Sequence, residues 1–111
     1  MMHPAAVLSR TDLPEVLVAV LDDLRHVMDA WRQGAGPKQL SGSVLRRARL
    51  ERELRAAQSQ GQLSPARDAA TVAADIIAVR DGLLLQWTVD PDAVDVLAVM
   101  EDHLRRLDAA E

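Results

Sequence analysis

Two groups of residues in this sequence have types and spacings that could do chemistry. Asp22, His26 and Asp29 are four and three residues apart, which places them on one face of a helix. Two carboxylates and an imidazole can hold a divalent metal ion, but a solvated polar helix face has the same pattern. Residues 34–38, GAGPK, faintly resemble a phosphate loop, yet the GK[ST] ending is missing and no strand precedes them. We therefore predict no metal site and no cofactor.

Signs of catalysis are weak in this sequence. There is no cysteine, and none of the serines has a neighbouring histidine in a recognisable motif. His103 lies beside the apolar stripe of the last predicted helix, which is typical of a boundary or pocket histidine. A small all-α enzyme, such as a chorismate-mutase-like dimer, needs several cations converging in a polar pocket, and Arg80 is the only candidate. We therefore predict that the protein is not an enzyme.

The charge of the chain opposes contact with nucleic acid. The formal net charge is −4 and the pI is about 5.3, the wrong sign for neutralising phosphates. The basic stretch 45–55, LRRARLERELR, has no aromatic residue on which a base could stack. Glu51 and Arg55 are an i,i+4 pair, which favours a solvated helix face. We expect this chain alone not to bind DNA specifically.

Composition favours one all-α domain over residues 1–111. Hydrophobic residues make up 49% of the sequence, without Phe or Tyr, so the core must be aliphatic. The longest unbroken apolar run, Val16 to Leu21, is far too short to cross a bilayer. The apolar run from Ala5 to Leu8 is too short for a signal peptide. We expect a cytoplasmic protein that does not contact membranes.

Four helices must position these residues, and the first carries the clearest stripe. It is expected to begin at a capping box formed by Asp12 and Glu15, with Pro14 in its opening turn. Its apolar residues then recur at steps of four and three: Leu13, Leu17, Val20, Leu24, Val27 and Trp31. The glycines and the proline of residues 33–42 end it.

The other three helices are predicted from their end signals. The second covers about 43–60 and stops at Gly61, with a thin apolar stripe that favours an outer position: Leu50, Leu54 and Ala57. The third is expected to begin near Asp68. The fourth is expected to have Asp90 as its N-cap and Pro91 at its first position. Its stripe would be Ala93, Leu97, Met100, Leu104 and Leu107.

The third helix has two apolar surfaces. Small residues are spaced by four along one ridge: Ala70, Ala74, Ala78 and Gly82. Bulky residues form another ridge: Val72, Ile76, Val79, Leu83 and Trp87. A bulky ridge fills a core, while a small ridge lets another helix approach closely. Because the chain offers few other apolar surfaces, we expect a second copy to supply the missing helices.

Residues 53–96 resemble the C-terminal effector-binding and dimerisation domain of TetR/AcrR-type transcriptional regulators. The resemblance rests on three segments: A-x-x-x-G-x-L at residues 57–63, D-G-L-x-L-Q-W at 81–87, and D-P-x-x-V/L-D at 90–95. It extends over about residues 44–107 and implies a small bundle of four main helices that dimerises through the last two. Nothing in residues 1–43 resembles the helix-turn-helix of the family, so the DNA reader is expected to be missing from this chain.

The resemblance implies that residues 69–89 and 91–108 pair with those of a second subunit as a four-helix interface. The residues expected there are Ala74, Ala78, Gly82, Leu85, Leu97, Met100 and Leu104. A small apolar effector in the helical core would be coupled to the geometry of the homodimer. The pocket residues are expected to be His26, Met28, Trp31, Gln86 and Trp87. The alternative is a helical structural or protein-interaction module without a ligand.

Overall fold

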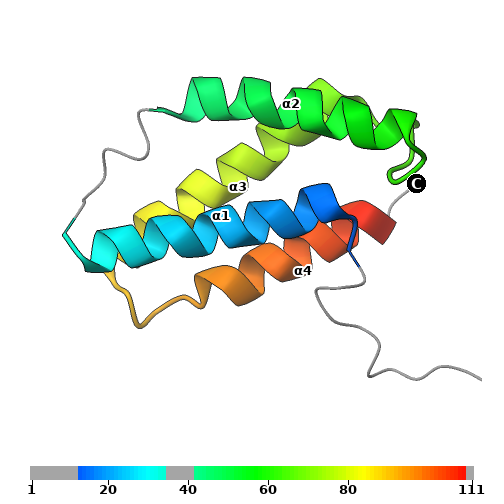
Figure 1. Cartoon of the computed structure of the whole chain (residues 1–111). Helices are drawn as coiled ribbons and strands as arrows, with labels where there is room; N and C mark the ends of the chain where they lie inside the picture. The colour runs from blue at the N-terminus through cyan, green and yellow to red at the C-terminus, as the bar shows by residue number, and fades with distance from the viewer. Residues whose placement is uncertain (1–12, 35–41, 110–111) are drawn as a thin grey trace, which may run out of the picture.

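The computed structural model describes residues 13–34 and 42–109, and these ranges contain four helices and no strand. Along the chain the helices are α1 (Glu15–Arg32), α2 (Ser43–Ser59), α3 (Ala69–Val89) and α4 (Val96–Ala109). Figure 1 shows α2 and α4 on opposite sides of α1, while α3 crosses behind at an angle. Successive helices run in opposite directions (Figure 1). The predicted all-α fold is confirmed.

The apolar stripe predicted for the first helix is confirmed as the buried face of α1. Leu17, Leu21 and Leu24 are almost fully buried, and Val27 and Met28 continue this face. The predicted bounds are close to the observed ones. Asp12, the first member of the predicted capping box, lies outside the described residues.

The end of α2 is set by Gly61, as predicted. Gly61 has φ of +76°, its N–H donates to the Gln58 carbonyl (3.2 Å), and the Gln62 N–H donates to the Ala57 carbonyl (2.8 Å). These two bonds form a Schellman motif, which requires a left-handed residue just after the helix. The side chain of Gln58 then donates to the carbonyls of Ser64 (3.1 Å) and Arg67 (2.7 Å), which ties the connection to α2.

Gly61→Ala should lower the free energy of unfolding by about 1–2 kcal/mol, because an L-residue pays this much in the left-handed region. A Cβ at Gly61 would meet nothing within 4 Å, so the cost is purely conformational. Urea denaturation monitored by circular dichroism measures it. Gln60→Ala is the matched control, since Gln60 is exposed and has φ of −92°. An unchanged midpoint for Gly61→Ala would contradict the argument.

Asp68 caps the N-terminus of α3, as predicted. Its carboxylate accepts hydrogen bonds from the Thr71 hydroxyl (2.8 Å) and the Thr71 N–H (3.0 Å). These bonds, the hydroxyl first, lower the pKa of Asp68 because they favour the charged carboxylate. A lowered pKa in the folded state means that the cap stabilises the fold at neutral pH. This contribution is lost as the pH falls through the lowered pKa.

The predicted start of the fourth helix is wrong by about five residues. Residues 90–95 form a turn, in which the Ala93 N–H donates to the Asp90 carbonyl, and α4 begins only at Val96. The capping carboxylate belongs to Asp95, whose Oδ1 accepts from the Ala98 N–H at 3.1 Å. Asp90 and Pro91 therefore start a turn that brings the chain from α3 to α4, and Ala93 is exposed there.

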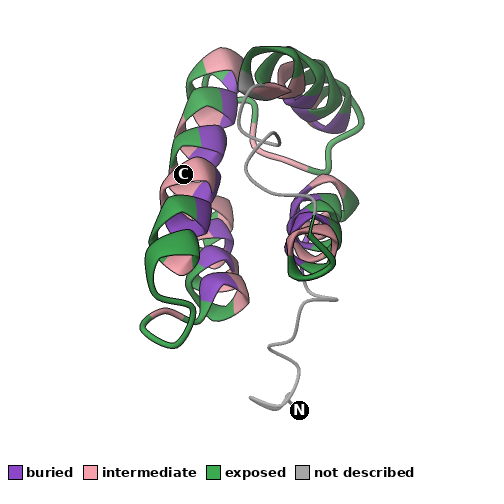
Figure 2. Cartoon of the chain, turned by 90° about the vertical axis from the view of Figure 1, so that its left-hand side faces the viewer, coloured by how far each residue is buried: buried purple, intermediate pink, exposed green. Residues whose placement is uncertain are grey.

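The core lies where the buried faces of the helices meet. Figure 2 shows the buried residues on the inward sides of the helices and the exposed residues on their outer sides. α3 packs along α2, and α4 packs against both α1 and α3. The thin stripe of α2 is fully used, since Leu50, Leu54 and Ala57 are all buried. Among the described residues, no helix has the length and apolar character needed to cross a bilayer.

Candidate functional site

A cavity of about 460 Å³ lies between α1, α2 and α3. Its volume falls in the usual range for small-molecule sites. More than half of its lining residues are aliphatic: Val16, Ala19, Val20, Leu45, Leu50, Ile76 and Ile77. Leu45 is 79% exposed, so its side chain stands at the margin of the cavity and not in the core. Each of the three helices α1, α2 and α3 forms one wall of the cavity.

Charged residues line part of the same cavity. Asp23 of α1 lies near two arginines: its Oδ2 is 3.5 Å from Nε of Arg80 and 3.7 Å from Nε of Arg46. Arg49 and Glu53 also line the cavity, and they pair with each other at 3.2 Å on the exposed side of α2. The cavity therefore joins an aliphatic surface to a cluster of one carboxylate and two guanidinium groups.

Arg80 is the buried charge of this cluster. Its side chain is only 1% exposed, and its Nη1 donates to Asp81 Oδ1 at 2.7 Å. Within the described residues, its Nε and Nη2 are buried and have no hydrogen-bond partner. A buried donor left without a partner costs about 1–3 kcal/mol. Burial first, and then the nearby charge of Arg46, lower the pKa of Arg80, while Asp23 and Asp81 oppose this shift.

The sequence carried a signal for Arg80 but none for its neighbours in the cavity. Arg80 falls on the buried face of α3, between the pairs Ile76–Ile77 and Leu83–Leu84, where the helical period calls for an apolar residue. Asp23 and Arg46 have ordinary positions on exposed or half-exposed faces. Their approach to Arg80 depends on how three helices pack, which local patterns do not encode.

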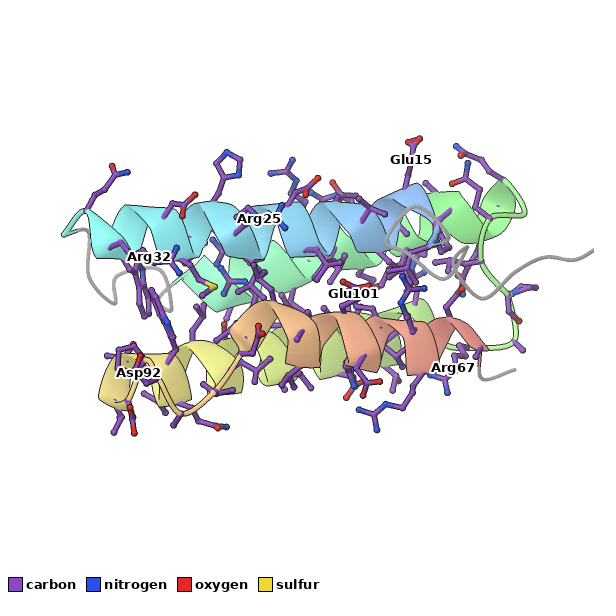
Figure 3. The ribbon with its side chains drawn as sticks, turned by 90° about the horizontal axis from the view of Figure 1, so that it is seen from below. Glu15, Arg25, Arg32, Arg67, Asp92 and Glu101 are labelled. Carbon is purple, nitrogen blue, oxygen red and sulfur yellow. The ribbon has the colours of Figure 1, made fainter. Side chains whose placement is uncertain are left out.

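The structure brings together two of the five predicted pocket residues. Trp31 of α1 and Trp87 of α3 are stacked, with ring centroids 6.1 Å apart and an interplanar angle of 26°. The guanidinium carbon of Arg32 lies 5.3 Å from the centroid of the Trp87 ring, within range of a cation–π interaction. Figure 3 shows Arg32 and Asp92 at this end of the bundle, with Glu15 and Arg67 at the other end.

The remaining predicted pocket residues lie apart from one another. Met28 is buried in the core, while His26 and Gln86 are exposed. The His26 ring nitrogen Nδ1 lies 3.1 Å from the backbone oxygen of Asp22 on its own helix. None of the five predicted residues lines the cavity between α1, α2 and α3. The cavity therefore supplies a second, separate set of candidate ligand contacts.

The polar face of α1 is occupied by ion pairs within the helix. Asp22 lies 3.3 Å from Arg25, and Asp29 lies 2.9 Å from Arg32. In the part of the chain that the structure describes, no group of three or more His, Cys, Asp or Glu residues could hold a metal ion. His103, predicted to be a boundary histidine, is half-buried, and its Nε2 lies 3.0 Å from Asp75 Oδ2 on α3.

Part of the predicted dimer interface forms an exposed apolar face on α3. Ala74 and Ala78 are exposed, Gly82 is half-exposed, and Leu85 is 57% exposed. Val89, at the end of the same helix, is 81% exposed. We call these five residues the small-residue face of α3. It lies away from the face of α3 that packs in the core.

The predicted interface residues of α4 need correction. Met100 and Leu104 are both 0% exposed, because they face the core of their own protomer. Leu97 is half-buried against the same core. The exposed apolar residue of α4 is instead Val99, at 40%. The stripe of α4 was correctly identified, but it belongs to the protomer core and not to the outer surface.

An all-α bundle with a cavity among its first three helices and a free face on α3 fits the C-terminal domain class of TetR-type regulators. A family model described as "BetI-type transcriptional repressor, C-terminal" matches residues 43–109, more than half of the chain. The chain belongs to this family, whose members are transcriptional regulators and in general not enzymes. Searches of curated proteins and of solved structures found no match.

Proposed function

We propose that this chain is the ligand-sensing and dimerisation part of a TetR-type regulator. The cavity between α1, α2 and α3 takes a small effector with an apolar body. The small-residue face of α3 packs against α3 and α4 of a second copy. Small side chains allow helix axes to approach closely, and exposed Leu85 and Val89 gain burial when a partner covers them.

The observation that carries this proposal is that α3 lines the cavity on one side and has an exposed apolar face on another. Ile76, Ile77 and Arg80 line the cavity, while Ala74 and Ala78 lie on the opposite side of the same two turns. A ligand that shifts α3 would therefore shift the surface offered to the partner. Such a coupling is a free energy shared by two sites, and it acts in both directions.

Light scattering after size exclusion at micromolar concentration should give the mass of a dimer. Exposed apolar residues gathered on one helix face favour cover by a second copy of the same surface. Ala78→Arg adds a long charged side chain at the centre of the face and should yield the monomer. A clean 12.1 kDa species for the unaltered protein would refute the dimer.

Small molecules with an apolar body should raise the melting temperature of the protein. A ligand that binds only the folded state stabilises it by about 2.7 kcal/mol at a hundredfold excess over its dissociation constant. A thermal-shift screen measures this, and Val20→Trp, which adds bulk to the cavity wall, should abolish the shift. If no compound stabilises the protein, a structural or protein-interaction module becomes the better interpretation.

This chain alone should not retard a DNA duplex in a sequence-dependent manner. Its net charge is −4, and a specific reader must place side chains on base edges in the groove. A gel-shift assay against a pool of duplexes at 150 mM salt tests the prediction. Enrichment of one sequence from the pool would contradict it.

A further inference from the structure

The guanidinium group of Arg80 has hydrogen-bonding capacity that the described part of the protein does not use. Arg80 lines the cavity and is 1% exposed, and its Nε and Nη2 have no hydrogen-bond partner within residues 13–34 and 42–109. Asp23 lies 3.5 Å from Nε, close enough for an ion pair but without hydrogen-bond geometry. Buried arginine donors in proteins are normally satisfied, so Nε and Nη2 of Arg80 are candidates to donate to a ligand bound in this cavity.

The charges around Arg80 are close to balanced. Three arginines and two acids line the cavity, and one pair of them, Arg49 with Glu53, is complete in itself. The remaining Asp23 is shared by Arg46 and Arg80, at 3.7 and 3.5 Å. Asp81 pairs with Nη1 of Arg80, but it is not part of the cavity lining. The lining alone has a formal charge of +1, which Asp81 offsets, so the case for a carboxylate rests on the unused donors of Arg80 and not on a surplus of positive charge.

The aliphatic part of the cavity lining determines which kind of group must be attached to the charged end of the ligand. Val16, Val20, Leu50, Ile76 and Ile77 present an aliphatic surface that a hydrated inorganic ion would leave uncovered. An apolar chain or ring of small-molecule size would cover it and gain the free energy of burial. The two halves of the lining together match a molecule with one charged end and one apolar end.

We propose that the cavity between α1, α2 and α3 binds an amphipathic organic monocarboxylate, with its carboxylate at Arg80 and Arg46 and its apolar part along the aliphatic lining. This inference rests on the proposed function, because it names the ligand class of the same cavity. An arginine fork binds a carboxylate through two parallel hydrogen bonds, which a neutral head group cannot reproduce. Arg80 would hold the ligand and set the preference for its charge.

Isothermal titration with three probes of equal chain length tests the assignment: decanoate, decanol and decyltrimethylammonium. Decanoate should bind at least about tenfold more tightly than decanol, the factor expected for a charge-assisted hydrogen bond. The cationic probe should bind least tightly, because it would meet Arg46 and Arg80. Titrations are run below the critical micelle concentrations of the two ionic probes and below the aqueous solubility of decanol.

Two variants assign the preference to the arginines. Arg80→Met keeps an unbranched side chain, shorter than that of arginine, and removes its charge, so the preference for decanoate over decanol should disappear while decanol binding changes little. Arg46 lies at the cavity margin, with a side chain that is 26% exposed. Arg46→Met should reduce the preference for decanoate in part. If Arg80→Met does not fold, Arg46→Met alone tests the assignment. Arg105→Met is the matched control, since Arg105 of α4 is also 26% exposed and lies outside the cavity lining.

The outcomes separate the two proposals. Equal binding of decanoate and decanol, or tighter binding of the cation, overturns the carboxylate assignment and leaves the effector cavity in place. An unchanged preference in both arginine variants also overturns it. If none of the three probes binds, the proposed effector cavity fails, and the carboxylate assignment fails with it.

Discussion

Leu104→Ala should lower the free energy of unfolding by about 2–5 kcal/mol, the usual cost of truncating a buried leucine. Leu104 is 0% exposed, and it lies in the core between α4 and its neighbours in the same protomer. The cost combines the lost burial with the cavity left behind, because a closely packed core relaxes only in part. Urea denaturation followed by circular dichroism measures it, and the loss should be the same at low and at high protein concentration.

Leu85→Ala is the matched control for Leu104→Ala, because it makes the same truncation on the small-residue face of α3. Leu85 is 57% exposed, so the protomer alone should lose little stability. In the proposed dimer Leu85 is covered, and its truncation should raise the dissociation constant. If Leu104→Ala proved neutral for unfolding, or if only its dimer were weakened, Leu104 would belong to an interface after all.

Gly82→Leu should shift the monomer–dimer equilibrium towards the monomer by a factor of ten or more. A Cβ at Gly82 meets nothing within 4 Å in the protomer, so the added side chain has room there. In the protomer alone the change is favourable, since glycine inside a helix costs about 0.8–1.0 kcal/mol relative to alanine and leucine ranks close to alanine. Against a closely packed partner helix the added volume costs about 1–3 kcal/mol per copy.

The effect of Gly82→Leu therefore has opposite signs in the two states. At dilute, monomeric concentrations the midpoint of denaturation should rise, and at high concentration it should fall below that of the unaltered protein. Ala48→Leu adds similar bulk on the exposed side of α2 and should leave the dimer unchanged. A midpoint raised by Gly82→Leu at every concentration would mean that this face stays exposed to solvent.

Local signals in the sequence predicted most of the helices because their causes are local. The Gly61 turn needs a left-handed residue, and the Asp68 cap needs a short acceptor before Thr71, so both follow from residues within one turn. The start of α4 was mistaken because Asp90 and Asp95 are both good caps. The choice between them depends on how far the chain must travel from α3 to α4, which is a property of the packed bundle.

The candidate sites were harder to predict because they depend on which surfaces meet. The stripe containing Met100 and Leu104 shows that one face of α4 is buried, but periodicity does not say whether the same chain or a second copy buries it. The cavity combines Asp23, Arg46 and Arg80 from three helices that are far apart in the sequence. Of these three residues, only Arg80 could be identified from the sequence, because it is a charged residue within an apolar stripe.

The stacked pair of Trp31 and Trp87 gives the protein its own optical reporter. These are the only tryptophans in the chain, and there is no tyrosine, so all of its ultraviolet fluorescence comes from one contact between α1 and α3. The same two helices form two walls of the cavity, whose lining does not include either indole ring. A ligand that changed the angle between α1 and α3 would therefore alter the emission without touching the fluorophores, and no label would be needed to follow the movement in real time.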